Sequence, residues 1–306
     1  MGYGGALIWT GLARNLKIHY PEKKIIFLYK KPIRNLLFYK PHSDHIIYKN
    51  NSDISLIIDK VSWLFIKHKF NKNEIILVDM DKPSYLYWEK DTKEKIYYKT
   101  GAHAIQIACN VHGITNAILQ PKIVLTSEEE NKVNKLLKTY GLEENKYICI
   151  EPHAKISFSP NKAWFWDHWE ALVCRINKLI FDRSLDFKIV QIGLKTDKIL
   201  KGVIDLTGST SFRETSRIIS YSRTFIGCEG GLVHLSQAVC KNSIVLISAM
   251  MPKELVAYPK NINFYTDIEC KHCGLKIPCP INRKCMQGIS VESVFESFKK
   301  LLLSEL

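Results

Sequence analysis

One stretch of the sequence, CEGGLVHLSQAV (228–239), places an acid, two glycines and a histidine within six residues. Gly230 and Gly231 permit a tight turn and close approach of a ligand to the backbone. The helical pattern that follows supplies unpaired N–H groups and the positive end of a dipole, which suit a phosphate. His234 could donate to a phosphate oxygen, and Glu229 could hold a ribose or sugar hydroxyl. A plain glycine turn with a core histidine is the alternative, and two glycines alone would favour it.

A second segment, SFSPNKAWFW (157–166), follows the apolar run YICIEP (147–152) and carries Ser157, Ser159 and Lys162. A lysine in such a loop can neutralise a diphosphate as a point charge. A solvated loop lysine is the alternative interpretation. If the lysine serves a ligand, this loop and the glycine turn must converge on one diphosphate.

A third segment, LTGSTSFRET (206–215), follows another apolar run and supplies Gly208, Ser209, Thr210 and Ser211. Small hydroxyl-bearing residues in a loop of this kind could line a phosphate region. The same residues are explained equally well as the N-cap of the helix that begins after them.

A cysteine-rich segment, CKHCGLKIPCPINRKC (270–285), has the spacing C-x2-C-x5-C-x5-C in a turn-rich stretch. Four thiolates at this spacing could close a tetrahedral site for structural zinc or iron, with no open position for chemistry. Free thiols are the alternative. Disulfides are disfavoured because nine scattered cysteines without an export signal fit a reducing compartment. The predicted ligands are Cys270, Cys273, Cys279 and Cys285.

Short β-rich runs alternate with helical patterns along the chain, which predicts βαβ units and parallel sheets. The runs in the first half are KKIIFLY (23–29), DHIIY (44–48) and EIILVDM (74–80). Those in the second half are YICIEP (147–152), FKIVQIG (187–193), VIDLTG (203–208), RTFIGCE (223–229) and NSIVLIS (242–248). Helices are predicted over 127–142, with a capping box of Ser127 and Glu130, and over 167–181.

The expected fold is therefore α/β, with two doubly wound, Rossmann-like domains facing each other across a cleft. The division is expected near 119–126, giving an N-terminal domain of residues 1–122 and a C-terminal domain of residues 123–306. The second domain includes the cysteine segment and an amphipathic terminal helix (290–306) that packs on a domain face. Ligands of open parallel sheets bind outside the carboxyl ends of the strands, which is where the three loops lie.

Length and charge narrow the function classes. At 306 residues the chain fits two domains, and its net charge of 44 − 30 = +14 would attract anionic surfaces. No run of five or six like charges marks a nucleic-acid tail. No apolar run approaches the roughly 20 residues of a membrane span, so a cytoplasmic protein with at most peripheral membrane contact is expected. A nicotinamide cofactor is disfavoured because no G-x-G-x-x-G follows a strand.

Three segments together resemble the ADP-heptose:lipopolysaccharide/protein heptosyltransferase family in their order and spacing. The resemblance covers about residues 145–300 firmly, and the first half more weakly through GYGGALIWTGLARNLK (2–17) and GAHAIQIACNVHGI (101–114). The lysine and acid-Gly-Gly-x-x-His elements are fairly specific as a pair. The three segments are SPNKAWFWDHWEALV, DLTGSTSFRETSRIISYSRTFIGCEGGLVHLSQAV and CPINRKCMQGISVESVFESFKKLL.

The resemblance implies an inverting glycosyltransferase of GT-B type. It would move a sugar, a heptose by analogy, from an ADP-sugar to a hydroxyl of a glycan, a lipopolysaccharide or a protein. Lys162 would meet the diphosphate, and the nucleotide sugar would be held by Gly4, Gly5, Ser159, Thr210, Ser211, Glu229, Gly230, Gly231 and His234. The resemblance also extends to the cysteine-rich segment, which in some members that modify proteins binds iron and in others holds no metal.

One departure from the family pattern concerns the general base. The family places an aspartate in the N-terminal glycine loop to take the acceptor's proton, and this chain has Gly5 and Ala6 there. The chain also starts at that loop, so the strand that should precede it is missing. Either the protein begins upstream, or the N-terminal domain is rebuilt. Asp79 and Asp81, at the end of EIILVDMD (74–81), are the nearest substitutes, with solvated loop acids as the alternative.

Two other functions stay open. A catalytically inactive scaffold or sugar sensor would keep the donor fold, which the missing aspartate favours. A nucleic-acid-binding protein using the cysteines as a zinc module would need basic and aromatic residues around 270–285. That segment has no aromatic residue, which disfavours nucleic-acid binding. Its basic residues are Lys271, Lys276, Arg283 and Lys284.

Overall fold

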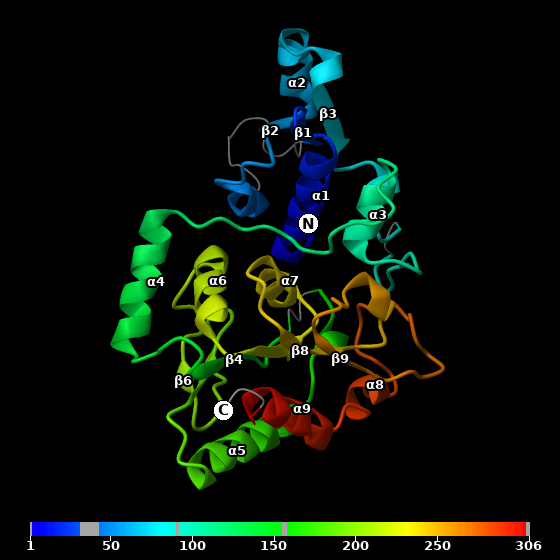
Figure 1. Cartoon of the computed structure of the whole chain (residues 1–306). Helices are drawn as coiled ribbons and strands as arrows, with labels where there is room; N and C mark the ends of the chain where they lie inside the picture. Colours follow the sequence, from blue (N-terminus) through cyan, green and yellow to red (C-terminus); the bar gives the residue numbers. More distant parts are fainter. Residues whose placement is uncertain (1, 31–42, 90–91, 155–157, 304–306) are drawn as a thin grey trace.

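Two separate parallel sheets organise the chain in the computed structural model, which describes residues 2–30, 43–89, 92–154 and 158–303 (Figure 1). The first sheet has the order β2-β1-β3. Its strands are short apolar runs whose neighbours pair in parallel. They are β1 (Lys24–Tyr29), β2 (Leu56–Asp59) and β3 (Ile75–Asp79).

The second sheet has six parallel strands in the order β6-β5-β4-β7-β8-β9. The strand order reverses between β4 and β7, and in doubly wound sheets ligands bind at this switch point, outside the carboxyl ends of the strands. Buried strands such as β8, apolar on both faces, fit helices on both sides of the sheet. The strands are β4 (Tyr147–Glu151), β5 (Lys188–Gln191), β6 (Ile204–Asp205), β7 (Phe225–Cys228), β8 (Ser243–Ile247) and β9 (Ile262–Tyr265).

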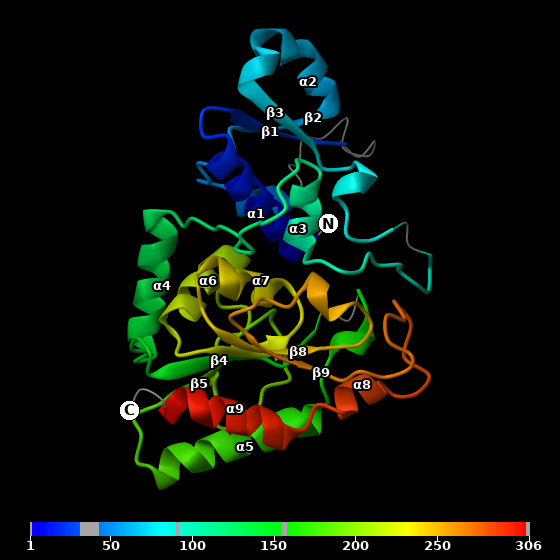
Figure 2. The same ribbon diagram turned by 45° about the vertical axis from the view of Figure 1, so that its right-hand side comes forward.

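Helices cover both faces of the second sheet (Figure 2). Helices α5 (Trp166–Asp182) and α9 (Val291–Leu303) lie on the face away from the first sheet, and α6 (Phe212–Tyr221) and α7 (Gly231–Ala238) lie on the face toward it. Helix α4 (Ser127–Thr139) packs beside α6. None of the helices in the described part of the chain is both long enough and apolar enough to cross a membrane.

Helix α1 (Tyr3–His19) joins the two halves, because it packs against α7 of the second half and α3 (Ala104–Asn110) of the first. The apolar side chains of α1, β1, α3, α6 and α7 form one continuous buried core across the junction. A second core lies between α5, α9 and the large sheet, and a smaller one lies under α2 (Lys60–Ile66). The two sheets therefore share buried apolar surface.

Three local predictions were wrong. The run 44–48 is not a strand; it lies in the 3₁₀ helix η2 (Ser43–Tyr48), and the first sheet uses β2 instead. A five-residue apolar run does not distinguish helix from strand, and η2 buries Ile47 and Tyr48 in the core around α1. The capping box of α4 is formed by Thr126 and Glu129, one residue earlier than predicted. Strand β9 was not among the predicted runs.

Candidate functional site

Lys162 and Glu229 meet at the carboxyl ends of neighbouring strands. Lys162 ends the 3₁₀ turn η6 (Pro160–Lys162) after β4, and Glu229 directly follows β7. Their Nζ and Oε1 atoms lie 3.9 Å apart, with the side chains 14% and 1% exposed. The backbone N–H and hydroxyl of Ser248 donate to the Glu229 carboxylate at 3.0 and 2.7 Å. The lysine loop and the glycine turn therefore converge.

Burial works against both charges of this pair. It raises the pKa of Glu229, although Lys162 and the Ser248 donors act in the opposite direction. It also lowers the pKa of Lys162, against the attraction of Glu229. An anionic ligand beside the ammonium would favour its charged form, so Lys162 is the member of the pair that is suited to an anion.

His234 lies in the first turn of α7, where its Nδ1 is 2.6 Å from the Tyr258 hydroxyl. Burial lowers the pKa of His234 to about 4, and Lys162 acts in the same direction. The imidazole is therefore neutral near pH 7. A neutral imidazole with one nitrogen bonded to tyrosine keeps the other for a ligand. Tyr258 was not predicted, because no motif connects it to His234 in the sequence.

Close packing, and not a left-handed backbone, favours glycine at Gly231, whereas a Cβ on Gly230 would meet only the Cys228 carbonyl, at an ordinary 3.7 Å. Gly230 has an extended φ of 175°. A Cβ on Gly231 would lie 3.1 Å from Phe212 Cε2, and one on Gly4 would lie 3.2 Å from Gly231 Cα and 3.0 Å from His234 Cδ2. The N-termini of α1 and α7 therefore face one another. Their dipoles present positive ends to the same place, which favours an anion there. Gly5 lies in the same first turn of α1.

Ser159 and Ser211 are engaged in holding loops. The Ser159 hydroxyl is buried and donates to the Leu275 carbonyl at 2.9 Å. Ser211 caps α6 by accepting from the Glu214 N–H, as the alternative interpretation predicted. Thr210 shares a hydrogen bond of 2.9 Å with a neighbouring threonine hydroxyl. Contact of these residues with a substrate stays a prediction, and Ser157 lies outside the described residues.

A groove of about 740 Å³ lies between α4 and the loop before α6, where it is lined by Lys132, Lys135, Ser209 and Thr210 among others. Neither Lys162 nor any residue of the glycine turn lines it. We place the site at the strand ends and not in this groove, because the buried charges and the facing helix N-termini lie there.

Asp79 is the last residue of β3, and Asp81 lies two residues after it, in the first half of the chain. Both pair with Lys60, at 2.7 and 3.2 Å, and Asp81 also accepts from the Lys30 N–H at 2.6 Å. No contact among the described residues joins either aspartate to Lys162 or His234. Their role as the base stays a prediction.

The four cysteines of the 270–285 segment line one cavity of about 20 Å³, room for a single water-sized sphere. Cys285 is buried, Cys270 is exposed, and the other two are half-buried. In the described part of the chain, no group of three or more His, Cys, Asp or Glu side chains is arranged to hold a metal ion. The thiols are gathered around one cavity without forming the expected tetrahedral set.

The cysteine segment ties the lysine loop to the first half of the chain. The Asn161 amide donates to the Leu275 and Ile277 carbonyls at 3.0 and 2.8 Å, and its oxygen accepts from the Cys279 N–H at 3.0 Å. On the other side, the Ile96 N–H donates to the Gly274 carbonyl at 2.8 Å. A Cβ at Gly274 would overlap the Ile96 carbonyl, and its φ is +61°.

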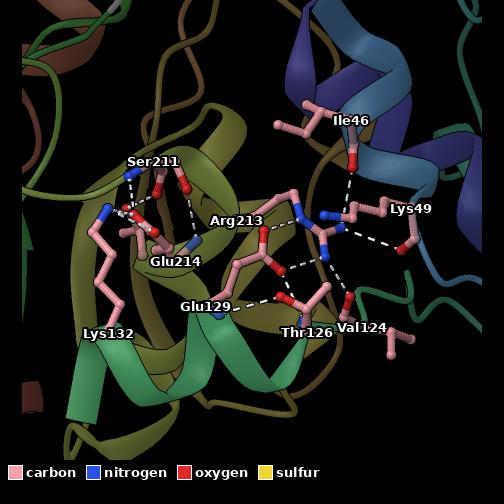
Figure 3. Close-up of polar contacts among 10 residues, drawn as sticks. Ile46, Lys49, Val124, Thr126, Glu129, Lys132, Ser211, Arg213 and Glu214 are labelled. Carbon is pink, nitrogen blue, oxygen red and sulfur yellow. Dashed lines mark hydrogen bonds and ion pairs between the residues drawn. The ribbon is translucent and has the colours of Figure 1, made fainter. Parts of the chain in front are cut away.

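A buried guanidinium makes a further connection (Figure 3). Arg213 of α6 is fully buried and donates to both carboxylate oxygens of Glu129 at 2.7 and 2.8 Å. It also donates to the carbonyls of Val124, Ile46 and Lys49. The bond from Arg213 holds the pKa of Glu129 down, to about 2. Arg213 thereby fixes the η2 region against α4 and α6.

Comparisons with known proteins agree with this architecture. The model of the family described as glycosyltransferase family 9 (heptosyltransferase) matches residues 90–283. A glycosyl transferase family 9 structure from Veillonella parvula DSM 2008 superposes with a TM-score of 0.67 at 16% identity, covering 99% of this chain and 95% of that one. No curated protein sequence matches significantly.

Two further structures share the fold. The E. coli ADP-heptose lps heptosyltransferase II has a TM-score of 0.59 and 14% identity, covering 99% of this chain and 96% of that one. The iron-containing dodecameric TibC of enterotoxigenic E. coli H10407 has a TM-score of 0.56 and 15% identity, covering 93% and 77%. TibC is also known in complex with ADP-D-beta-D-heptose. The expected α/β fold of two Rossmann-like domains, GT-B in type, is confirmed.

Proposed function

The chain belongs to glycosyltransferase family 9 (heptosyltransferase), and from this premise we propose that it moves a heptose from ADP-heptose to an acceptor hydroxyl with inversion. The observation that carries the proposal is the meeting of Lys162 and Glu229 at the strand ends, together with His234 beside two facing helix N-termini. ADP-heptose is the ligand that TibC binds, and the chemistry of this site suits it. We assign the donor mainly to residues 123–306 and the acceptor, a glycan, a lipopolysaccharide or a protein, to residues 1–122.

The leaving group explains the residue types. Negative charge accumulates on the departing diphosphate as the glycosidic bond breaks. Lys162 supplies a fixed positive charge, and the N–H groups at the starts of α1 and α7 supply donors that need no rearrangement. His234 adds a neutral donor, since burial holds the pKa of its imidazole at about 4. The Glu229 carboxylate accepts from a hydroxyl of the sugar or the ribose.

The acceptor's proton requires a base, and we propose Asp79 or Asp81 for it. The carboxylates are half-exposed and keep Lys60 as a partner. Replacement of each by Asn should lower turnover by about 10²–10³ with little change in donor affinity, if it is the base. Unchanged turnover in both variants rules both out.

A catalytically inactive sugar-binding scaffold is the second candidate, because Gly5 and Ala6 stand where the family has its aspartate. Incubating the purified protein with a panel of nucleotide sugars separates the two. Binding of ADP-sugars with slow donor hydrolysis supports the enzyme, and binding without turnover supports the scaffold. Binding of no nucleotide sugar overturns both.

We also propose a structural metal, zinc or iron, at the four cysteines. TibC is described as iron-containing, and here all four thiols line one small cavity. Binding of a metal would require the four thiols to move closer together. It would stabilise the cysteine segment, which holds the lysine loop. Elemental analysis of protein purified without added metal tests this. One equivalent of zinc or iron, lost in a Cys273→Ser, Cys279→Ser variant, is expected, and metal-free folded protein contradicts it.

A further inference from the structure

His103, in the N-terminal half, is held in one tautomer. It caps α3, and its Nδ1 accepts from the Ile105 N–H at 3.2 Å. Burial, and then His234, lower the pKa of His103 to about 3, so the ring is neutral near pH 7. A neutral ring that accepts at Nδ1 carries its proton on Nε2. That N–H is a donor and cannot serve as a base.

The Nε2 donor is buried and has no hydrogen-bond partner among the described residues. His103 itself is 4% exposed. Its ring lies 4.6 Å from the ring of Tyr258, whose hydroxyl bonds to His234. Buried donors are nearly always paired in folded proteins, so this one is available to an acceptor atom of a ligand or of a bound water molecule.

Tyr98 presents a second donor of this kind. Its hydroxyl is buried and has no partner in the part of the chain that the structure describes. Burial raises its pKa, and Tyr87, Glu229 and Cys273 act in the same direction, so the hydroxyl keeps its proton near pH 7. Ile96, two residues earlier, is bonded to Gly274, which fixes this segment against the second half.

These groups favour a sugar hydroxyl over a diphosphate as their ligand. Two neutral donors from the first half lack a partner among the described residues, and the second half contributes the Glu229 carboxylate. A diphosphate carries acceptors only, and Glu229 would repel it. A sugar hydroxyl both accepts and donates, so it can take a bond from His103 or Tyr98 and give one to Glu229.

We propose that His103 and Tyr98 bind hydroxyl groups of the donor's sugar and so help to decide which sugar the site accepts. This rests on the proposed function, since the sugar arrives on ADP. The diphosphate stays with Lys162 and the helix N-termini. The two halves of the chain thus contact different parts of the donor. The first half binds part of the sugar, and the second half binds the nucleotide.

Calorimetric titration of the full chain with ADP and with ADP-heptose tests the division. Tyr98→Phe should weaken ADP-heptose binding about tenfold and leave ADP binding unchanged, because one hydrogen bond to the sugar is lost. Tyr97→Phe, a change at an exposed neighbouring tyrosine, is the matched control and should alter neither.

Two substitutions at His103 distinguish the hydrogen bond that its Nε2–H would donate to the sugar from its role as the N-cap of α3. Asn is a good N-cap but does not reach the Nε2 position, so His103→Asn should keep the melting temperature and weaken ADP-heptose binding about tenfold. Gln places an amide N–H near Nε2 but caps poorly. His103→Gln should therefore lower the melting temperature and retain ADP-heptose affinity within about threefold.

The outcomes are distinct. Equal losses for ADP and ADP-heptose would mean that these residues serve the nucleotide, and unchanged affinities for both would mean that they serve no ligand; either overturns the inference alone. Wild-type protein that binds neither compound overturns the proposed function together with it.

Discussion

Glu151 ends β4 at the same sheet edge as Lys162, with its Oε1 3.8 Å from where a Cβ on Gly193 would lie. Burial raises the pKa of Glu151 to about 8, from an ordinary 4.5. Between these two pH values the folded chain holds a proton that the unfolded chain has released. Stability contributed by this carboxyl is therefore present below pH 4.5 and falls as the pH rises toward 8.

Glu151→Gln should remove that dependence. We expect the variant to unfold at a higher urea concentration than wild type at pH 8, and at the same concentration at pH 4.5. Glu128→Gln, on the exposed side of α4, is the control and should leave the pH profile unchanged. A Glu151→Gln variant destabilised at pH 8 would show that the carboxylate is ionised and bonded in the folded chain.

Lys162 offers a direct test of the diphosphate site. Lys162→Gln should weaken ADP binding by at least about 30-fold, because removing one partner of a buried charge pair costs about 2–5 kcal/mol. Lys178→Gln, at a lysine 74% exposed and paired with Asp182, should have no effect. Titration calorimetry measures both, and equal affinities would remove Lys162 from the site.

The convergence of the Lys162 loop with the turn that carries Glu229 and His234 could be predicted from the sequence. Each of the two segments follows the end of a strand in a parallel sheet. The sequence did not reveal Tyr258, His103 or Tyr98. Tyr258 lies after a short 3₁₀ turn, and the other two come from the opposite half of the chain. Their approach depends on how two sheets pack, which local patterns do not encode.

Helix α6 is held at its start by Arg213, which has charge and geometry matched to five acceptors. Arg213→Met should cost about 3–5 kcal/mol in the free energy of unfolding, since Glu129 would lose its bidentate partner. Arg217→Lys, one turn along the same helix, should cost less than about 1 kcal/mol. Urea unfolding measures both, and comparable losses would mean that the buried network is no more important than a surface contact.

Most elements followed from alternating runs and helical periods, and those misjudged share a cause. The 44–48 run is as apolar as a strand but too short for its periodicity to decide. The run INFY (262–265) carries half-buried residues at the sheet edge, which weakens the apolar signal. The capping box of α4 shifted by one residue because Thr126 and Ser127 are both good caps.

Connections between the two halves among the described residues include the apolar contact of α1 with α7, the bonds of Arg213, and the Ile96–Gly274 pairing. We expect them to unfold together. Scanning calorimetry should give one transition whose calorimetric and van't Hoff enthalpies agree. Two resolved transitions, one of them insensitive to ADP, would mean that the halves are independent.

The bonds from Arg213 to Ile46, Lys49 and Val124 all end on main-chain carbonyls. Substitution at those three positions leaves the acceptors in place, provided the backbone path persists. Homologous sequences can therefore vary at positions 46, 49 and 124 while position 213 stays arginine. Correlated substitutions between the two halves should be rare at this junction. Methods that infer spatial proximity from correlated mutations would miss this junction, although two hydrogen bonds from a buried guanidinium cross it.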